Sequence, residues 1–203
     1  MNFKNFIKKI EEIENFNIER DFILNDIKEL KFNLDNKINS NICFKNISYN
    51  IIIISQKDNI IKFDEDIIKE NIKKCDFAFF IFAAFLKDEY INIRHVASLI
   101  INNKLKEVIL FDILDNNFIK NTSKFFIKKI NVNYKFISTK LINKNNYDKL
   151  NFCQICVPVS LFFIYVYINF NISLDEFIKF LLKNKLRYKT DLMYKFITFL
   201  ESN

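Results

Sequence analysis

One imidazole, one carboxylate and two thiols are the residues of this chain whose types and order could carry nucleophilic chemistry. His95 is the only histidine, Asp112 follows it, and Cys153 and Cys156 come later in the sequence. An imidazole oriented by a carboxylate can remove the proton of a thiol, and the resulting thiolate is a strong nucleophile. These residues are therefore the candidates for a thiol site, and any general-base chemistry by a histidine depends on His95 alone.

The stretch from His95 to Asp112 consists of two apolar runs separated by a polar turn, which predicts a β-hairpin. A turn centred on Asn103 and Lys104 would set Leu99 opposite Val108 and, further out, His95 opposite Asp112. Residues directly opposite each other on one face have Cβ atoms about 4.5 to 5.5 Å apart. The carboxylate could then orient the imidazole through a ring N–H.

Each of the two residues also has an ordinary structural interpretation. His95 could simply begin a strand at the surface, and Asp112 could end the next strand in a turn. Asp115 is a neighbouring carboxylate that could take the role of Asp112.

Both late cysteines precede a largely apolar stretch, Val159 to Phe170, predicted to be a buried helix entered through Pro158. A cysteine at a helix N-terminus has a lowered thiol pKa, because the positive end of the helix dipole stabilises the thiolate. The alternatives for Cys153 and Cys156 are a CxxC redox or zinc half-site, or two core cysteines. A single CxxC without a second pair of ligands is weak evidence for a zinc site.

The composition excludes several classes of site. The chain has no glycine, so glycine-rich phosphate loops of the P-loop or Rossmann kind are disfavoured. A single histidine excludes multi-histidine metal sites, and we expect neither a metal nor a cofactor. The net charge is +7, but the lysines are scattered, which favours a solvated basic surface and leaves nucleic acid as a weakly supported partner.

Features of the whole chain indicate a reducing compartment. Four cysteines, including Cys43 and Cys75, occur without a recognisable secretory signal at the start. The longest apolar stretches, Phe77 to Leu86 and Val157 to Ile168, are shorter than the roughly 20 residues that a membrane-spanning helix needs. We therefore expect a protein without a membrane span.

Hydrophobic periodicity predicts an α+β chain with two parts: a helical extension over residues 1–46 and a main domain over residues 47–203. Two amphipathic helices are expected between Phe3 and Leu34, followed by an Asn-rich loop. Ser173 and Glu176 form a capping box that opens another helix. The remaining predicted elements are strands at Tyr49–Ile54, Phe77–Phe85 and Asn131–Ser138, and helices at Ile60–Cys75 and Asp191–Leu200.

From Phe77 to Leu200 the sequence resembles the ubiquitin-like-protein (SUMO) proteases, and more closely related cysteine proteases of large DNA viruses. The resemblance rests on three segments: the run from Arg94 to Ile101 that contains His95, the run from Val108 to Asp112, and Phe152-Cys153-Gln-Ile before the apolar helix. It implies a papain-like cysteine protease fold with a mixed or antiparallel central sheet flanked by helices. It also implies Cys153 as nucleophile, with Cys156 as the fallback, His95 as general base and Asp112 as the orienting acid.

The sequence departs from the family pattern at three places. Val96 replaces the usual aromatic residue after the histidine, and Gln154 replaces the usual glycine after the cysteine. No glutamine stands where the oxyanion donor is expected, in Lys144 to Lys149, and Asn145 or Asn146 is the substitute. Loss of one such donor lowers turnover by about 10² to 10³.

These observations predict a cysteine peptidase or isopeptidase that cleaves a viral precursor or a ubiquitin-like conjugate, in the host cytoplasm or the virion. A protein substrate is then the expected partner. Two alternatives remain: a catalytically inactive virion-structural or interaction protein with the same fold, and a Cys-dependent acyltransferase.

Overall fold

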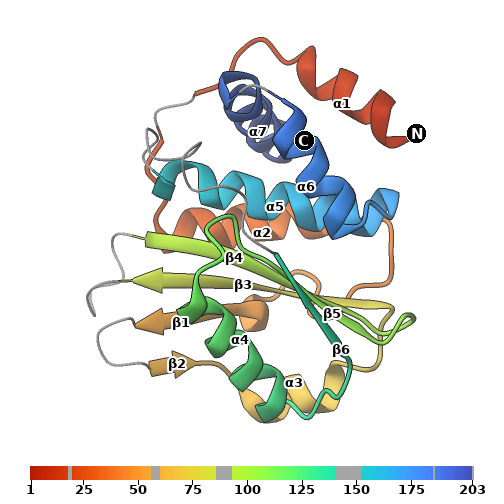
Figure 1. Ribbon diagram of the computed structural model, residues 1–203, viewed down its shortest axis with the longest axis vertical. Helices are drawn as coiled ribbons and strands as arrows, with labels where there is room; N and C mark the ends of the chain where they lie inside the picture. The colour runs from red at the N-terminus through yellow and green to blue at the C-terminus, as the bar shows by residue number, and fades with distance from the viewer. Residues whose placement is uncertain (18–19, 56–59, 86–92, 140–151, 185, 203) are drawn as a thin grey trace.

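The computed structural model describes residues 1–17, 20–55, 60–85, 93–139, 152–184 and 186–202. Within them a mixed six-stranded sheet with the order β2-β1-β3-β4-β5-β6 separates two layers of helices. Helices α2, α5 and α6 lie on one face, with α1 and α7 packed on their outer side, and α3 and α4 cover the other face (Figure 1). This arrangement confirms the predicted α+β class with a mixed sheet flanked by helices.

Two central strands run through the middle of the sheet and are buried on both faces. They are β3 (Phe77–Phe85) and β4 (Ile93–Asn102), which pair antiparallel. Their continuous apolar sequence follows from this position, because neither face meets solvent. The remaining strands are β1 (Ile51–Ser55), β2 (Ile60–Lys62), β5 (Glu107–Phe111) and β6 (Lys135–Ser138).

The two N-terminal helices were predicted, and they contribute to the main core. Phe6 and Ile10 of α1 (Phe3–Glu11) and Leu30 of α2 (Leu24–Lys37) are buried together with residues of α5 and α7. A boundary at residue 46 stays a prediction.

Three sequence predictions are corrected by the structure. The segment Ile60–Cys75, expected to be one helix, contains the short strand β2 and then α3 (Glu65–Asn71), which Asp64 caps. Helix α4 (Asn117–Lys129) was not predicted at all. Pro158 does not begin a helix, because α5 (Phe152–Phe170) starts six residues before it and contains it.

The last two helices follow their expected signals. Helix α6 (Leu174–Lys183) begins at the predicted capping box, in which Ser173 and Glu176 exchange hydrogen bonds. Helix α7 (Leu186–Glu201) starts earlier than the pattern indicated. None of the helices in the described ranges has the length and apolar composition needed to cross a membrane.

Turns that would often use glycine are built from other residues. Among the described residues six non-glycine residues have positive φ, with values between 47° and 59°. Asparagine and aspartate tolerate this region better than other side chains, and they supply four of the six positions. The six are Phe44, Asn46, Lys106, Asp115, Asn131 and Asn171.

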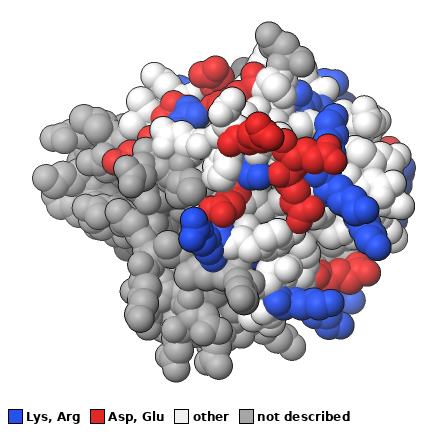
Figure 2. All heavy atoms as spheres, turned by 90° about the horizontal axis from the view of Figure 1, so that it is seen from above, with Lys and Arg blue, Asp and Glu red and all other residues white. Residues whose placement is uncertain are grey.

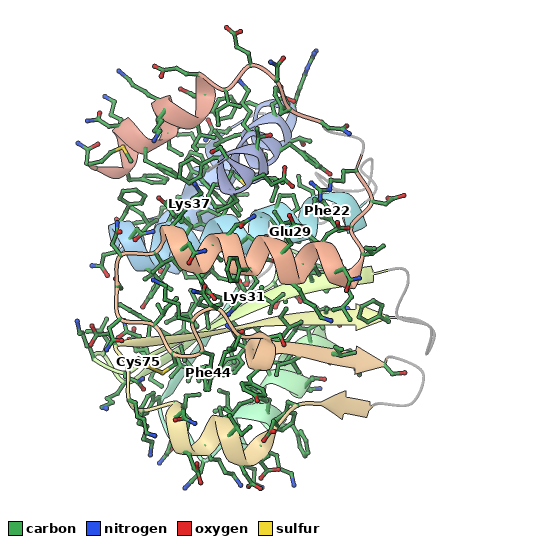
Figure 3. The ribbon with its side chains drawn as sticks, turned by 180° about the vertical axis from the view of Figure 1, so that it is seen from behind. Phe22, Glu29, Lys31, Lys37, Phe44 and Cys75 are labelled. Atoms are coloured by element: carbon green, nitrogen blue, oxygen red, sulfur yellow. A yellow bond between two sulfur atoms is a disulfide. The ribbon has the colours of Figure 1, made fainter. Side chains whose placement is uncertain are left out.

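A disulfide and a buried ion pair hold the segment between α2 and β1. Cys43 and Cys75 are bonded with a Cα–Cα distance of 5.4 Å, a pairing that the sequence did not predict. The ammonium of Lys31 on α2 contacts Asp35 and donates to the carbonyl oxygens of Phe44 and Ile47 at 2.8 and 2.6 Å. Figure 3 shows this side of the molecule, with Lys31 pointing from α2 toward the segment that carries Phe44.

Candidate active site

His95 lies near the start of β4, where the central sheet ends. It pairs with Ala84 of β3, and a bulge follows immediately, because Phe85 pairs with Ile93 and leaves Arg94 as the extra residue. Bulges of this kind bend a strand and are frequent next to active sites. The His95 side chain is only 4% exposed.

The structure brings His95 and Asp112 together. The Nε2 atom of the imidazole lies 2.7 Å from Oδ1 of the carboxylate, and both side chains are buried. Asp112 directly follows the last residue of β5. The predicted contact is therefore present.

The predicted hairpin register was nevertheless wrong by two residues. Leu99 lies opposite Leu110 rather than Val108, because the turn is longer than a two-residue loop. Asn102 Oδ1 accepts hydrogen bonds from the N–H groups of Lys104 and Leu105 within this turn. A shift of two keeps every side chain on its face, so His95 and Asp112 still meet, along a diagonal instead of directly across.

Three backbone groups fix the position of Asp112. Its Oδ1 accepts a hydrogen bond from the N–H of Leu114 at 2.9 Å, and its Oδ2 accepts one from Asn116, the N-cap residue of α4, at 2.8 Å. Its own N–H donates to Thr139 Oγ1 at 2.9 Å. The position of Asp112 is thus fixed by contacts that do not involve the imidazole.

These contacts determine which nitrogen of His95 could act as a base. Asp112, when ionised, only accepts hydrogen bonds, so Nε2 carries the hydrogen of this contact. In the neutral ring Nδ1 then holds the lone pair. This Nδ1 is buried and has no hydrogen-bond partner among the described residues.

Cys156 does not meet His95. It is fully buried among residues of the helical layer, and burial together with the nearby Cys156 raises the pKa of Tyr194 on α7. His95 lies opposite Ala84 and therefore shares its face, which packs toward α3 and α4. The sheet separates Cys156 from the imidazole, which argues against the fallback nucleophile.

Cys153 lies in the first turn of α5, and its side chain is outside the described ones. Two contacts show that α5 and β4 run in the same direction: Ser160 Oγ donates to Val96 O at 3.3 Å, and Asn102 Nδ2 donates to Tyr167 Oη at 3.0 Å. Cys153 precedes Ser160 by two helical turns, or about 10 Å. The first turn of α5 is therefore at the end of the sheet where β4 begins, as Figure 1 shows.

Other candidate residues are placed as follows. Asp115 does not replace Asp112, because its carboxylate lies 3.7 Å from Lys120 Nζ. Asn145 and Asn146, the expected oxyanion donors, lie outside the described residues. Thr139 was missed, since a threonine that follows a predicted strand gives no signal in a single sequence.

Grouped metal ligands and surface charge bear on two other kinds of site. Within the described ranges no three His, Cys, Asp or Glu side chains are grouped so that they could hold a metal ion. Figure 2 shows that acidic side chains gather on the face over α1 and α7, with basic ones around them. This face is not the uniformly basic surface that phosphate binding requires.

The fold can now be compared with known proteins. No protein-family model and no curated protein matches the sequence. ChlaDub1 from Chlamydia trachomatis has a similar structure, with a TM-score of 0.60 and 9% sequence identity over 93% of this chain and 94% of that one. The chain has the ubiquitin-like-protein protease fold. This fold was implied by the resemblance in sequence, and the comparison confirms it.

Two further solved structures show weaker similarity. The Ulp1 protease domain, in a complex with Smt3, the yeast ortholog of SUMO, matches with a TM-score of 0.45 and 14% identity over 97% of this chain and 93% of that one. The ASFV pS273R protease matches with a TM-score of 0.41 and 16% identity over 62% of this chain. The match spans 44% of the length of the ASFV protease. At these TM-scores neither similarity by itself establishes a shared fold.

Proposed function

We propose that the chain is a cysteine peptidase or isopeptidase in which Cys153 is the nucleophile, His95 the general base and Asp112 the residue that orients the base. The observation that carries the proposal is the 2.7 Å contact between His95 Nε2 and Asp112 Oδ1, which leaves a buried Nδ1 without a described partner. The ubiquitin-like-protein protease fold supports the same chemistry.

The mechanism uses Nδ1 of His95 twice. Nδ1 takes the proton of the Cys153 thiol, and the thiolate attacks the carbonyl carbon of the scissile bond. The protonated imidazole, held by Asp112, then gives this proton to the leaving amine, which leaves an acyl-enzyme. In the second half Nδ1 takes a proton from water, and the resulting hydroxide attacks the thioester. The C–S bond then breaks, the acid product leaves, and the imidazolium returns its proton to the Cys153 thiolate.

The location of α5 supports Cys153 as the nucleophile. Because α5 and β4 run in the same direction, the first turn of α5 is at the same end of the sheet as His95. A thiol carried by this helix can approach the imidazole only around that end, because the sheet blocks the approach further along. Cys153 occupies the first turn, and Cys156 is fully buried in the helical layer.

A ubiquitin-like conjugate is the substrate class that we propose first. The Ulp1 domain was solved with Smt3, which makes a ubiquitin-like conjugate the first candidate for this chain. A viral precursor, the other substrate class expected from the sequence, stays a prediction. A location in the host cytoplasm or the virion stays a prediction.

The rate of alkylation by iodoacetamide at pH 6, read residue by residue with mass spectrometry, tests the proposal. We expect rapid labelling of Cys153 in the wild type and in Cys156→Ala, and a rate about 10²-fold lower in His95→Ala, because a thiol without its base is mostly protonated at this pH. Cys153→Ala should show no rapid labelling at any position.

Equally slow labelling in all four proteins would overturn the proposal and favour an inactive binding or virion-structural protein. Rapid labelling accompanied by acetyl transfer from a CoA donor, without cleavage of a SUMO or ubiquitin conjugate, would favour the acyltransferase alternative.

A further inference from the structure

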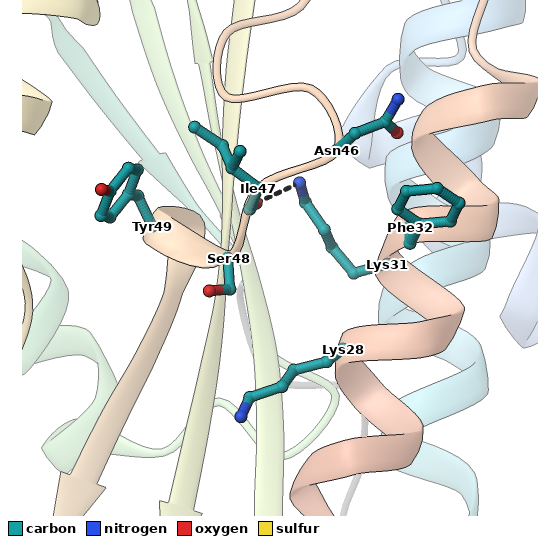
Figure 4. Close-up of a pocket in the computed structure, with 7 residues that line it drawn as sticks. All are labelled: Lys28, Lys31, Phe32, Asn46, Ile47, Ser48 and Tyr49. Carbon is teal, nitrogen blue, oxygen red and sulfur yellow. Dashed lines mark hydrogen bonds between the residues drawn. The ribbon is translucent and has the colours of Figure 1, made fainter.

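A second candidate site lies between α2 and the segment that leads into β1, and it is separate from the pair of His95 and Asp112. A pocket of about 440 Å³ opens there (Figure 4). Its lining is contributed by Lys28, Lys31 and Phe32 of α2, and by Asn46, Ile47, Ser48 and Tyr49.

Large apolar side chains are exposed around this pocket. Phe32 is 47% exposed, Ile47 is 43% exposed and Tyr49 is 40% exposed. Exposed apolar side chains that occur singly need no explanation, whereas a group of them around a hollow is typical of a binding surface. Three such residues at one pocket therefore indicate a surface that another molecule covers.

The floor of the pocket is rigid. Lys31 is buried, and its ammonium uses its three hydrogens on Asp35 and on the carbonyl oxygens of Phe44 and Ile47. Asp35 Oδ2 also accepts a hydrogen bond from the N–H of Asn46 at 2.7 Å. These contacts fix the segment that forms one wall, so a partner would meet a preformed surface and lose little binding energy to ordering it.

The charge at this pocket is positive. Lys28 lines it, and Lys45 is close enough to Asp35 to act on that carboxyl electrostatically. Lys31 also lines the pocket, but its charge is paired with the buried carboxylate of Asp35. Among the described residues Lys28 has no carboxylate within ion-pair distance, and Figure 4 shows its side chain extending from α2 toward the segment that carries Ser48. A partner that offers a carboxylate would thus gain a favourable contact.

We propose that this pocket binds an acidic segment of a partner protein that inserts one apolar side chain between Phe32 and Tyr49 and places a carboxylate beside Lys28. Positive charge around the pocket, together with its exposed aromatic and aliphatic walls, selects this chemistry over a basic or a purely apolar segment. This binding site does not depend on thiol chemistry. The proposal can therefore be correct even if the chain is not a peptidase.

The test uses the intact chain, labelled at isoleucine δ1 methyl groups, and three hexapeptides followed by NMR. The acidic peptide Asp-Glu-Leu-Phe-Glu-Asp should shift the Ile47 methyl signal saturably, while the methyl of Ile23, which is 42% exposed, serves as the reference. A peptide with serines in place of Leu-Phe, and one with lysines in place of the acids, should each bind at least about tenfold more weakly, which corresponds to about 1.4 kcal/mol.

Matched variants assign the binding to the pocket. Phe32→Ser and Lys28→Glu should each weaken binding of the acidic peptide at least about fivefold. Phe125→Ser removes an aromatic residue that is 48% exposed on α4, and Lys4→Glu reverses an exposed lysine on α1, so both should bind as the wild type does.

Three outcomes would overturn the proposal. The Ile47 signal could fail to respond to the acidic peptide, or all three peptides could bind equally. Self-association of the chain that Phe32→Ser abolishes would instead identify a second copy of the chain as the occupant. Thiol alkylation measured on the same variants should remain at the wild-type rate, which separates this site from the candidate active site.

Discussion

The hydroxyl of Thr139 accepts a hydrogen bond from the backbone N–H of Asp112 at 2.9 Å, and donates one to the carbonyl oxygen of Leu110 at 3.2 Å. Thr139 therefore joins the last residues of β6 to the end of β5. Through this contact it positions the carboxylate that holds His95.

Replacing Thr139 with valine tests this positioning role. The change keeps the shape of the side chain but leaves a buried N–H without its acceptor, so the free energy of unfolding should fall by about 1 to 3 kcal/mol in urea titrations. Thr139→Ser keeps the hydroxyl and should restore most of the loss. Because Thr139 positions Asp112, the alkylation rate of Cys153 should fall in the valine variant and recover in the serine variant. An unchanged rate in both would mean that the threonine is only structural.

The buried pair of Lys31 and Asp35 gives a second prediction. Burial lowers the pKa of Lys31 and raises that of Asp35, while their mutual contact opposes both shifts. Lys31→Met leaves the carboxylate buried without its partner and should lower the free energy of unfolding by about 3 to 5 kcal/mol. Replacing both residues, as Lys31→Met with Asp35→Leu, should recover much of this loss.

A matched control for this pair is Lys69, which forms an ion pair with Glu65 on the exposed surface of α3. Both side chains of that pair are more than a third exposed, at 38% and 36%. Lys69→Met should therefore change stability by less than about 1 kcal/mol. Equal losses of unfolding free energy in Lys31→Met and Lys69→Met would contradict the stronger contribution expected of the buried pair.

The disulfide between Cys43 and Cys75 gives a third prediction. It closes a loop with a sequence separation of 32 residues, so removing it should lower the free energy of unfolding by about 3 to 4 kcal/mol through the entropy of the unfolded chain. Unfolding in urea with and without dithiothreitol measures the difference. The double variant Cys43→Ala with Cys75→Ala should behave like the reduced wild type and should not respond to the reductant.

The capping box of α6 predicts a dependence on pH. Hydrogen bonds from the hydroxyl and the N–H of Ser173 hold the pKa of Glu176 below its usual value. A carboxyl whose pKa is lowered by folding stabilises the fold when it is ionised, so its contribution is present near pH 7 and is lost as the pH falls through roughly 5 to 3.

Melting temperatures of the wild type and Glu176→Gln should therefore differ at pH 7 and converge in this acid range. Asp175→Asn, a change at the neighbouring position of the same turn, should leave the pH dependence as it is in the wild type. A difference between the wild type and Glu176→Gln that persists at pH 3 would contradict the capping role.

The sequence predicted the sheet and the contact of His95 with Asp112 better than it predicted the geometry behind them. Side chains alternate between the two faces of a strand, so a register shift by an even number of residues keeps His95 and Asp112 on the same face. The two-residue error in the turn therefore did not separate them. The turn itself could not be read correctly, because Asn102 caps it with its side chain and Lys106 adopts a positive φ without glycine to mark it.

Two helix boundaries show a different limit. The start of α4 had a readable signal in Asn116, whose side chain caps the helix. The stretch after Asp112 was nevertheless interpreted only as the end of a strand, so no helix was predicted there. Pro158 was taken as a helix start because proline suits the first turn. It lies instead inside α5, which is buried by neighbouring elements. The free energy gained from this burial outweighs the loss of one backbone hydrogen bond at the proline.

Turns built without glycine place side chains in the left-handed region of the backbone. Lys106 holds a left-handed conformation that is unfavourable for a side chain with a Cβ, by roughly 1 kcal/mol or more. A glycine at such a position would remove this strain from the loop between β4 and β5. It would also make the unfolded chain more flexible, which opposes the gain in stability. Thermostable forms of the protein can thus be sought first in its loops, without repacking the interior.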